Sequence, residues 1–406
     1  MIKDLYPIFI IIFIATIWFN KSESLETNVP APTISKTIVA DDSTLIFLKD
    51  FEDRLIEGMN ERKIPGGAVV ITKGSSIIYQ KGFGVKVKGT TDSVDVHTAF
   101  RLGSVSKGFA SILTGIMVED EILTWNDPII NHLPEFELND PEQSKRVQIN
   151  HLLSHTSGLP RHAYTNLIED GLSLNRIIPR FKSVNLISEE GTQLAYQNAA
   201  YAIIEKVIEE HSDTSFGGTL RSQLFDPLGM NNTSTTYDDL IENKNKAMPH
   251  LYHSRRKGLL PASISKKYYN AISAGGINAS IADMGNWLLM LTGNNPEVIS
   301  DEILNQIFEP RATINNRRFS RYWNNVNESY YGLGWRVLNN DTQKVIYHGG
   351  YVNGFRSEIA FDKENQIGIC ILFNSPSSYA LQVIPEFFNE FTPKNIVPIE
   401  TLPVTE

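Results

Sequence analysis

A serine and a lysine three residues apart, Ser104 and Lys107, are the pair in this sequence best suited to nucleophilic chemistry. They lie where an extended segment gives way to apolar residues at helical spacing, which predicts a helix beginning near Ser104. Residues three apart share one face of a helix, so the lysine amine can reach the serine hydroxyl. A lysine desolvated in a cleft can act as the base that a serine nucleophile needs. The structural alternative is a helix N-cap with an exposed lysine.

A second polar patch, Tyr196-Gln197-Asn198, precedes an amphipathic helical pattern. A tyrosine can transfer protons, and an asparagine can bind a substrate amide or orient the lysine. The structural alternative is a packed tyrosine beside a helix-capping asparagine. The patch is therefore a candidate partner for the serine–lysine pair.

A third patch, His348-Gly349-Gly350, follows a strand pattern near the carboxyl end. Two glycines at a strand edge let a substrate approach the backbone closely. The next backbone N–H, that of Tyr351, can pair with that of Ser104 as an oxyanion hole. The structural alternative is a glycine turn beside a surface histidine.

Three histidines, His151, His155 and His162, are spaced in a way that resembles metal ligands. The glutamate of a His-Glu-x-x-His motif is missing, and the following residues interrupt the helix, so we predict no metal site. Ser157 has no base near it in the sequence and is not expected to be a nucleophile. Cys370 lies in an apolar strand-like run, which is typical of core packing.

The composition excludes several classes of protein. The chain has 406 residues, of which 41% are hydrophobic, and a formal charge of −9, with a single cysteine. It is long enough for one large fold or two lobes and too apolar to be disordered. The acidic balance argues against a nucleic-acid partner, which would select a basic surface. One cysteine allows no intramolecular disulfide.

The amino-terminal residues 1–22 predict a signal peptide or a membrane anchor. An apolar run at residues 8–19 follows Lys3, and its length suits a signal-peptide core better than a full membrane span. No small-residue cleavage site follows closely, so an uncleaved anchor with membrane association stays open. We expect an exported chain, periplasmic or extracellular. Residues 23–42 lack periodicity and predict a linker.

The rest of the chain predicts an α/β (α+β) fold over residues 43–393, followed by a tail at 394–406. A helix from Ser43 and a hairpin around Lys73-Gly74 open the domain, and helical patterns fill the middle. Strand patterns return late, with a final helix that contains Pro385. Both ends then complete one antiparallel sheet flanked by helices. An inserted, mainly helical lobe at about 104–265 leaves a cleft against it.

Several ordered motifs resemble the serine β-lactamase and penicillin-binding-protein superfamily, specifically its class C β-lactamase and D-alanyl-D-alanine carboxypeptidase branch. The resemblance covers about residues 43–393. Besides Ser104-Val-Ser-Lys107 it rests on Leu152-Leu-Ser-His-Thr-Ser-Gly-Leu-Pro160, Tyr196-Gln-Asn198, Pro227-Leu-Gly-Met230, Ser273-Ala-Gly-Gly276 with Asp283, Tyr331-Gly-Leu-Gly-Trp335 and His348-Gly-Gly350.

The resemblance implies an acyl-serine mechanism that uses no cofactor. Ser104 would be the nucleophile, and Lys107 with Tyr196 would handle proton transfer. The backbone N–H groups of Tyr351 and Ser104 would form the oxyanion hole. Asn198 would contact the substrate amide.

One departure concerns the third motif, where class C β-lactamases have Lys-Thr-Gly and this chain has His348-Gly349-Gly350. By the resemblance, these residues line the third wall of the substrate site. The permanent cation that suits a β-lactam carboxylate is gone, because histidine is mostly neutral at pH 7. Arg356 is a candidate replacement, although a surface arginine is the alternative. This departure weakens the argument for efficient β-lactam hydrolysis and leaves acyl transfer from Ser104 unaffected.

We accordingly predict an exported serine hydrolase that acts on a peptide, ester or lactam carbonyl, resembling D-Ala-D-Ala carboxypeptidases or esterases. Its partner would be a small-molecule or peptide substrate, such as a peptidoglycan stem, a β-lactam or an ester. The alternative is a non-catalytic or slowly acylated receptor that binds penicillin or peptidoglycan.

Overall fold

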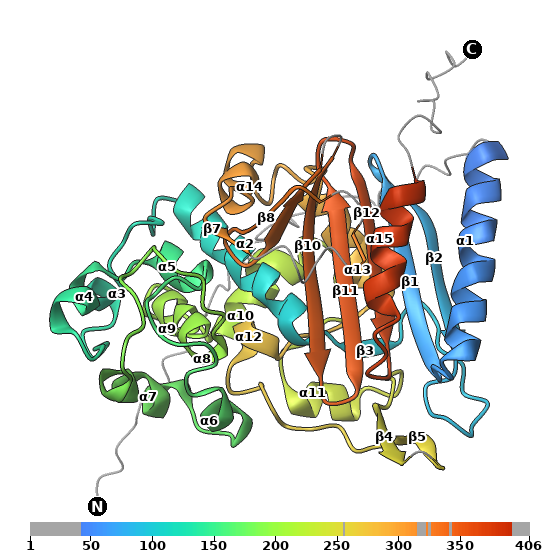
Figure 1. Cartoon of the computed structure of the whole chain (residues 1–406), viewed down its shortest axis with the longest axis horizontal. Coiled ribbons are helices and arrows are strands. Elements are labelled where there is room, and N and C mark those ends of the chain that lie inside the picture. The colour runs from blue at the N-terminus through green and yellow to red at the C-terminus, as the bar shows by residue number, and fades with distance from the viewer. Residues whose placement is uncertain (1–41, 255, 315–321, 324–325, 341–342, 392–406) are drawn as a thin grey trace, which may run out of the picture. The chain divides into compact units, whose positions relative to one another are not determined.

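A computed structural model describes residues 42–391, apart from 255, 315–321, 324–325 and 341–342. The predicted leader and carboxyl-terminal tail lie outside these residues, and so does the predicted linker apart from its last residue, Asp42. Asp42 is the first residue of helix α1 (Asp42–Glu61), which was predicted to start at Ser43. The described unit is a mixed α/β fold with a large antiparallel sheet flanked by helices (Figure 1). The predicted fold class is confirmed.

The main sheet has its strands in the order β2-β1-β12-β11-β10-β9-β8-β7, and every neighbouring pair is antiparallel. Both ends of the described chain contribute to it, as predicted. Its strands are β1 (Gly66–Lys73), β2 (Ser76–Gly84), β7 (Ala312–Thr313), β8 (Glu328–Tyr331), β9 (Arg336–Asn339), β10 (Lys344–Val352), β11 (Phe355–Asp362) and β12 (Ile367–Phe373). Sequence patterns had predicted parts of β1, β2 and β10 to β12 but not the short strands β7, β8 and β9.

The central strands are buried on both faces, which explains their nearly continuous apolar sequences. Successive side chains of a strand point to opposite faces. In β12, Ile369 and Ile371 belong to one hydrophobic cluster, whereas Cys370 and Leu372 belong to the other. The fully buried Cys370 is therefore a packing residue, as its sequence context predicted.

One face of the sheet is covered by α1 and by α15 (Ala380–Glu390), which Figure 1 shows in blue and red. Phe51 of α1 and Phe387 of α15 meet with ring centroids 6.0 Å apart. Pro385 lies inside α15, as predicted for the final helix. The first and last helices therefore close the same layer.

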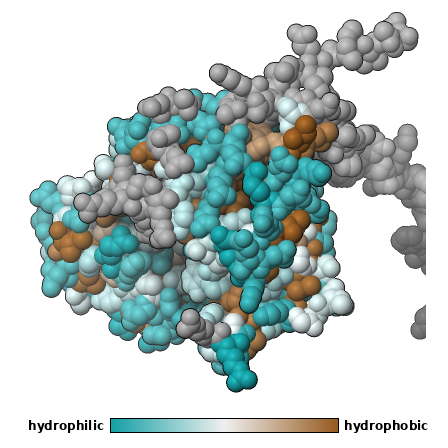
Figure 2. All heavy atoms as spheres, turned by 45° about the vertical axis from the view of Figure 1, so that its right-hand side comes forward, coloured by the Kyte–Doolittle hydropathy of each residue, from teal (hydrophilic) through white to brown (hydrophobic). Residues whose placement is uncertain are grey.

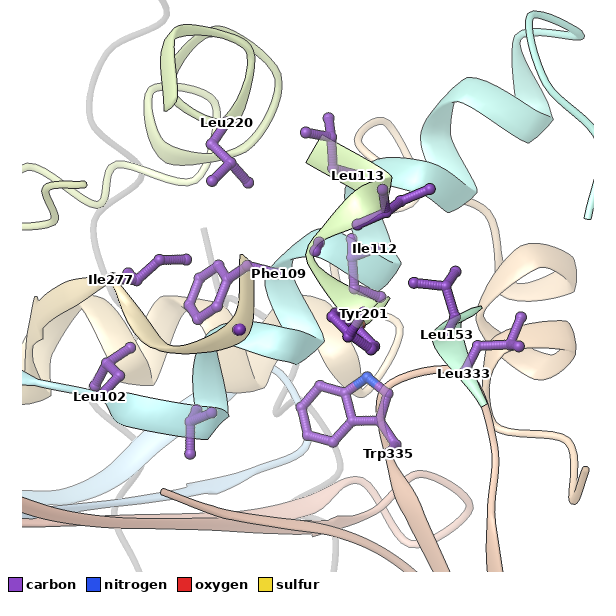
Figure 3. Close-up of a cluster of buried hydrophobic side chains, with 14 of the residues drawn as sticks. Leu102, Phe109, Ile112, Leu113, Leu153, Tyr201, Leu220, Ile277, Leu333 and Trp335 are labelled. Atoms are coloured by element: carbon purple, nitrogen blue, oxygen red, sulfur yellow. The ribbon is translucent and has the colours of Figure 1, made fainter. Parts of the chain in front are cut away.

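The other face is covered by α2 (Ser106–Glu119) and α13 (Ile281–Leu291), with the helical lobe beyond them. The spacing of apolar residues predicted one buried face on α2, but every residue from Ser106 to Met117 is buried. Small residues allow this, since a Cβ at Gly108 would clash with the ring of Trp335. Figure 3 shows Phe109, Ile112 and Leu113 of α2 in this core, with Tyr201 and Trp335 beside it.

The lobe consists of short helices joined by loops. It comprises α3 (Ile129–His132), α4 (Pro141–Arg146), α5 (Ile149–Leu153), α6 (Thr165–Glu169), α7 (Leu174–Ile177), α8 (Asn198–Tyr201), α9 (Ile203–Glu210), α10 (Phe216–Leu220) and α11 (Tyr237–Glu242). After it come α12 (Ile272–Gly275) and α14 (Asp301–Ile307). Two small sheets pair β3 (Ala99–Arg101), which precedes α2, with β6 (Asn278–Ser280), and β4 (His250–Ser254) with β5 (Gly258–Pro261). The amphipathic helical pattern that follows the Tyr196-Gln197-Asn198 patch forms two helices, α8 and α9, which are separated at Ala202.

Polar residues dominate the face of the molecule in Figure 2, and apolar residues are scattered over it in small patches. Two of the more exposed large apolar side chains, Leu45 and Ile46, lie on α1. Among the helices of the described ranges, none combines the length and apolarity needed to cross a bilayer.

Candidate active site

Ser104 lies in a short 3₁₀ turn, Gly103–Val105, between β3 and α2. The helix predicted near Ser104 is present, with its α-helical part starting at Ser106. Gly103 has a φ of +52°, and a Cβ there would lie 2.8 Å from the backbone nitrogen of Tyr351. Glycine thus lets the turn that carries Ser104 press against β10.

Gly350 of β10 makes the matching close approach. A Cβ at Gly350 would clash with the Leu102 carbonyl oxygen and lie 3.1 Å from the backbone nitrogen of Ser104. The Ser357 hydroxyl donates a hydrogen bond of 2.5 Å to the same Leu102 carbonyl, which ties the two segments together. The backbone segments of Ser104 and Tyr351 therefore lie side by side, as an oxyanion hole requires.

Lys107 is fully buried, and its amine is held by acceptors from two other elements. The amine donates to Oδ1 of Asn198 at 2.8 Å and to the carbonyl oxygen of Ala274 at 2.9 Å. Burial lowers the pKa of Lys107, although the neighbouring Tyr196 opposes that shift. A lowered pKa brings the neutral, basic form of the amine closer to neutral pH.

Tyr196 connects the lysine with the serine. Burial alone would raise the pKa of its phenol, but the nearby charges of Lys107 and Arg336 and the polar surroundings of Lys107 and Ser104 outweigh that effect and lower it. The Lys107 amine also lies 4.9 Å from the centre of the Tyr196 ring. The phenol is therefore placed to carry a proton between the Ser104 hydroxyl and the Lys107 amine.

The predicted site residues gather at one cavity of about 640 Å³. It is lined by Ser104, Tyr196, Asn198, Gly349, Gly350 and Tyr351, among others. Lys107 lies behind its wall and connects to it through Tyr196. The elements that meet there are the turn before α2, the start of α8 and strand β10.

The expectation that His348 lines the substrate wall is corrected by the structure. The ring is fully buried, with Nε2 3.0 Å from the Tyr331 hydroxyl and Nδ1 3.0 Å from the Gly349 carbonyl oxygen. Burial, together with the nearby charge of Arg336, lowers the pKa of His348 well below its ordinary value. The neutral ring supports Tyr331 from behind, and the following Gly349 and Gly350 form the wall.

Three arginines line the cavity, Arg161, Arg336 and Arg356, and the last two differ in their partners. Arg356, the predicted replacement for the missing cation, forms an ion pair of 2.5 Å with the fully buried carboxylate of Glu358. Arg336 instead lies near two aromatic rings, 5.9 Å from the centre of Tyr331 and 5.6 Å from that of Tyr347. Within the part of the chain that the structure describes, no carboxylate pairs with Arg336, so its charge is available to a ligand.

The histidines that resembled metal ligands have other contacts. His155 packs against Tyr196 with ring centroids 4.2 Å apart, and Nδ1 of His151 accepts a hydrogen bond from the backbone of Gln148. Over the described ranges, no group of three His, Cys, Asp or Glu side chains could hold a metal ion. The Ser157 hydroxyl donates to Oε1 of Gln197 at 3.0 Å.

Comparison with known protein families shows to which family this chain belongs. The family model described as beta-lactamase matches residues 51–383. The chain belongs to the beta-lactamase family. The predicted superfamily resemblance is thereby confirmed.

Among the similar curated proteins of this family is the unguisins hydrolase ungD' of Aspergillus campestris, which is 26% identical over 86% of this chain and 64% of its own length. The beta-lactamase-like protein 4 of Dictyostelium discoideum is 25% identical over 83% of this chain and 62% of its own length. Protein flp of Staphylococcus aureus is 23% identical over 82% of this chain and 64% of its own length. The chain thus spans slightly less than two thirds of the length of these curated relatives.

A solved structure shares the beta-lactamase-family fold. The octameric penicillin-binding protein homologue from Pyrococcus abyssi superposes with a TM-score of 0.74 at 24% identity, over 86% of this chain and 79% of that chain. At this identity the likeness supports the fold alone.

Two contacts of this beta-lactamase-family site were not predicted from the sequence. Arg336 follows the Tyr331-Gly-Leu-Gly-Trp335 motif directly, and strand pairing places it opposite Tyr347. The position of Arg336 directly after this motif, in a strand, was the feature of the sequence that could have identified it. The Ala274 carbonyl that holds Lys107 comes from the backbone, and a side-chain pattern cannot reveal it.

A buried carboxyl, Glu205 of α9, holds the segment that supplies this carbonyl. Oε1 of Glu205 accepts hydrogen bonds from the backbone nitrogen of Ser273 at 2.7 Å and from its hydroxyl at 2.6 Å. Burial raises the pKa of Glu205 to about 7, with a further contribution from Glu209 and partial opposition from the bonds to Ser273. The carboxyl therefore keeps its proton in the folded protein over a range in which the unfolded chain loses it.

This difference predicts a stability change with pH. Because the folded-state pKa is raised from 4.5 to about 7, the folded protein binds more protons between these values. The free energy of unfolding then falls as pH rises through this window, by about 3 kcal/mol from this group. We expect Glu205→Gln to remove that contribution, so that its free energy of unfolding relative to wild type rises between pH 5 and pH 8. Urea unfolding at both pH values measures the difference.

The control for this prediction is Glu210→Gln, at an exposed site on the same helix. Equal pH dependence of the free energy of unfolding in Glu205→Gln and in wild type would contradict the prediction.

Proposed function

We propose that this chain is a serine hydrolase in which Ser104 attacks a carbonyl group and forms an acyl-enzyme. The observation that carries the proposal is the position of Tyr196, which lines the same cavity as Ser104 and has the buried Lys107 amine 4.9 Å from its ring centre. A nucleophile next to a base, with the base oriented by further groups, is the arrangement that covalent catalysis needs. The adjacent N–H groups of Ser104 and Tyr351 supply the site for the oxyanion.

In the proposed acylation, the Ser104 oxygen forms a bond to the carbonyl carbon while its proton passes to Tyr196. The phenol proton is in turn taken by the Lys107 amine, whose pKa is lowered by burial. The carbonyl electrons move to the oxygen between the two backbone N–H groups. When the tetrahedral species collapses, the bond to the leaving group breaks, and the leaving group takes the proton back through Tyr196.

Deacylation repeats these steps with water. A water molecule attacks the acyl carbon and gives one proton to Tyr196, and the Ser104 oxygen leaves as its hydroxyl is restored. The products are a carboxylic acid and the free enzyme. The described residues supply every proton acceptor that these steps use.

For the substrate, we propose a small molecule or peptide with a carboxylate beside the reacting carbonyl, as in carboxypeptidase substrates. The support is Arg336, whose guanidinium faces the cavity. A guanidinium binds a carboxylate through paired, charge-assisted hydrogen bonds. Without an ion-pair partner within the described ranges, Arg336 takes the role that the missing lysine of the third motif would have had.

The test is intact-mass spectrometry of the purified chain after exposure to a penicillin, a D-Ala-D-Ala peptide and a neutral activated ester. We expect a covalent adduct whose mass matches the acyl part of the reagent and which disappears as water releases it. An adduct that persists for hours would support the slowly acylated receptor instead. Absence of any adduct with all three reagents would contradict the proposed acyl transfer.

Arg336→Met is the matched variant for the substrate class. Hydrogen bonds to charged groups contribute about 1.5–3 kcal/mol, so acylation by carboxylate-bearing reagents is expected to slow by on the order of 100-fold. Acylation by the neutral ester is expected to slow less, because Arg336 acts on it only through the lowered pKa of Tyr196. An equal loss with both classes of reagent would contradict carboxylate recognition by Arg336.

A further inference from the structure

Tyr268 adopts an unusual backbone conformation at the edge of the cavity. It precedes α12 and lines the cavity beside Asn198. Its φ of +71° lies in the left-handed region, which is unfavourable for a bulky side chain. Gly275 makes room for its ring, since a Cβ there would lie 3.2 Å from it. A strained residue held at a site suggests that its side chain has a task there.

The Tyr268 hydroxyl lies between two polar side chains. It donates to Oε1 of Glu169 at 3.2 Å and accepts from Nδ2 of Asn198, also at 3.2 Å. A phenol has one proton, and a carboxylate has none to give. Burial and the charge of Glu169 raise the pKa of Tyr268, so the phenol keeps that proton. The proton therefore goes to Glu169, which leaves the phenol oxygen as an acceptor only.

This one-way pattern determines how the Asn198 amide is turned. Amide oxygen and nitrogen are assigned by their partners, and here the partner on one side can only accept. The nitrogen must face Tyr268, so the oxygen faces Lys107, to which it is bonded at 2.8 Å. We propose that Glu169 and Tyr268 are a positioning pair that fixes the Asn198 amide with its oxygen toward Lys107.

The orientation decides which part of the lysine amine is free to act as a base. A neutral amine has two N–H groups and one lone pair. Asn198 and the Ala274 carbonyl take both N–H groups, so the lone pair is left for Tyr196. A turned amide would present its own N–H group to Lys107 and compete for that lone pair. The positioning pair thus acts on proton transfer through the Asn198 amide, which it holds in place.

The inference rests on the proposed acyl transfer from Ser104, so the first readout is the rate of Ser104 acylation by a neutral activated ester. We expect Tyr268→Phe to slow acylation about tenfold, which corresponds to one hydrogen bond, with little change in the ester concentration that gives half-maximal rate. Glu169→Ala leaves both the phenol and the amide in place but frees the phenol proton. It is expected to slow acylation by about three- to tenfold.

Two controls separate orientation from packing. Lys267→Met removes the other partner of Glu169, which lies 2.6 Å away, and Tyr269→Phe removes the hydroxyl of the adjacent tyrosine, which donates to Asn278. Both are expected to acylate within about twofold of wild type. In an Asn198→Ala background there is no amide to orient, so Tyr268→Phe is expected to have no further effect.

A second readout does not depend on acylation. In ¹⁵N spectra, the Asn198 side-chain amide is identified by its absence in Asn198→Ala, and its exchange with solvent is measured. We expect exchange to accelerate in Tyr268→Phe and Glu169→Ala but not in Lys267→Met. Unchanged exchange in both variants, or a tenfold acylation loss that persists in the Asn198→Ala background, would overturn the positioning pair. Failure of wild type to acylate would instead overturn the proposed function, and amide exchange would still test the pair.

Discussion

Ser104→Ala is expected to abolish acylation and turnover while the protein stays folded. The Ser104 oxygen is the protein atom that bonds to the substrate carbon in the proposed mechanism, and the shorter side chain leaves the turn and the oxyanion segments unchanged. Loss of a serine nucleophile costs on the order of 10⁶-fold in turnover. Intact-mass spectrometry after treatment with a fluorophosphonate or penicillin probe measures the loss of adduct, and circular dichroism reports the fold.

The control is Ser157→Ala, which removes the hydroxyl of a fully buried serine. It is expected to label like the wild type, because the buried Ser157 hydroxyl donates its proton to the Gln197 side chain. Undiminished labelling of Ser104→Ala would contradict the assignment of Ser104 as the nucleophile. Labelling that shifts to a different residue would show that the probe reacts outside the proposed site.

Lys107→Met is expected to slow acylation by on the order of 10² to 10⁴-fold, the usual contribution of a positioned base. Without the amine, Tyr196 loses both the acceptor for its proton and the positive charge that lowers the pKa of its phenol. Stopped-flow measurement of acylation by an activated ester gives the rate. Stability is expected to change in the opposite direction, because a buried amine is costly to desolvate and methionine fills similar space.

The midpoint of thermal unfolding therefore accompanies the rate measurement. We expect the midpoint for Lys107→Met to equal or exceed that of wild type. Lys86→Met is the control, since Lys86 is another largely buried lysine but pairs with Asp92 away from the cavity. A Lys107→Met variant that retains full acylation would contradict the base assignment, and one that loses activity only because it unfolds would show a structural role.

The sequence was most informative where function depends on local spacing. Ser104 and Lys107 are three residues apart, and the helix that follows carries apolar residues at regular intervals, so both the helix and its reactive start could be predicted. The late strands β11 and β12 were equally clear, because their apolar runs are bounded by a polar turn. These features depend on neighbours in the chain rather than on distant contacts.

Tertiary packing decided the features that the sequence could not predict. His348 and Arg356 both occupy plausible positions beside the glycine pair, but the fold buries one and pairs the other with Glu358. Arg336 remains for the ligand because its strand faces the cavity without a carboxylate within the described ranges. Which of two nearby cations keeps its charge free depends on partners that only the folded chain brings together.

The hydrogen bond between the Ser357 hydroxyl and the Leu102 carbonyl joins residues 255 positions apart in sequence. The oxyanion segments that this bond ties together are therefore completed only after β10 and β11 have been synthesised. During translation, the turn that carries Ser104 leaves the ribosome long before the strand that will complete its site. Contacts of such long range are formed late and slowly in folding. A nascent chain would thus carry its nucleophile in an unassembled and unreactive form until nearly the whole domain had emerged.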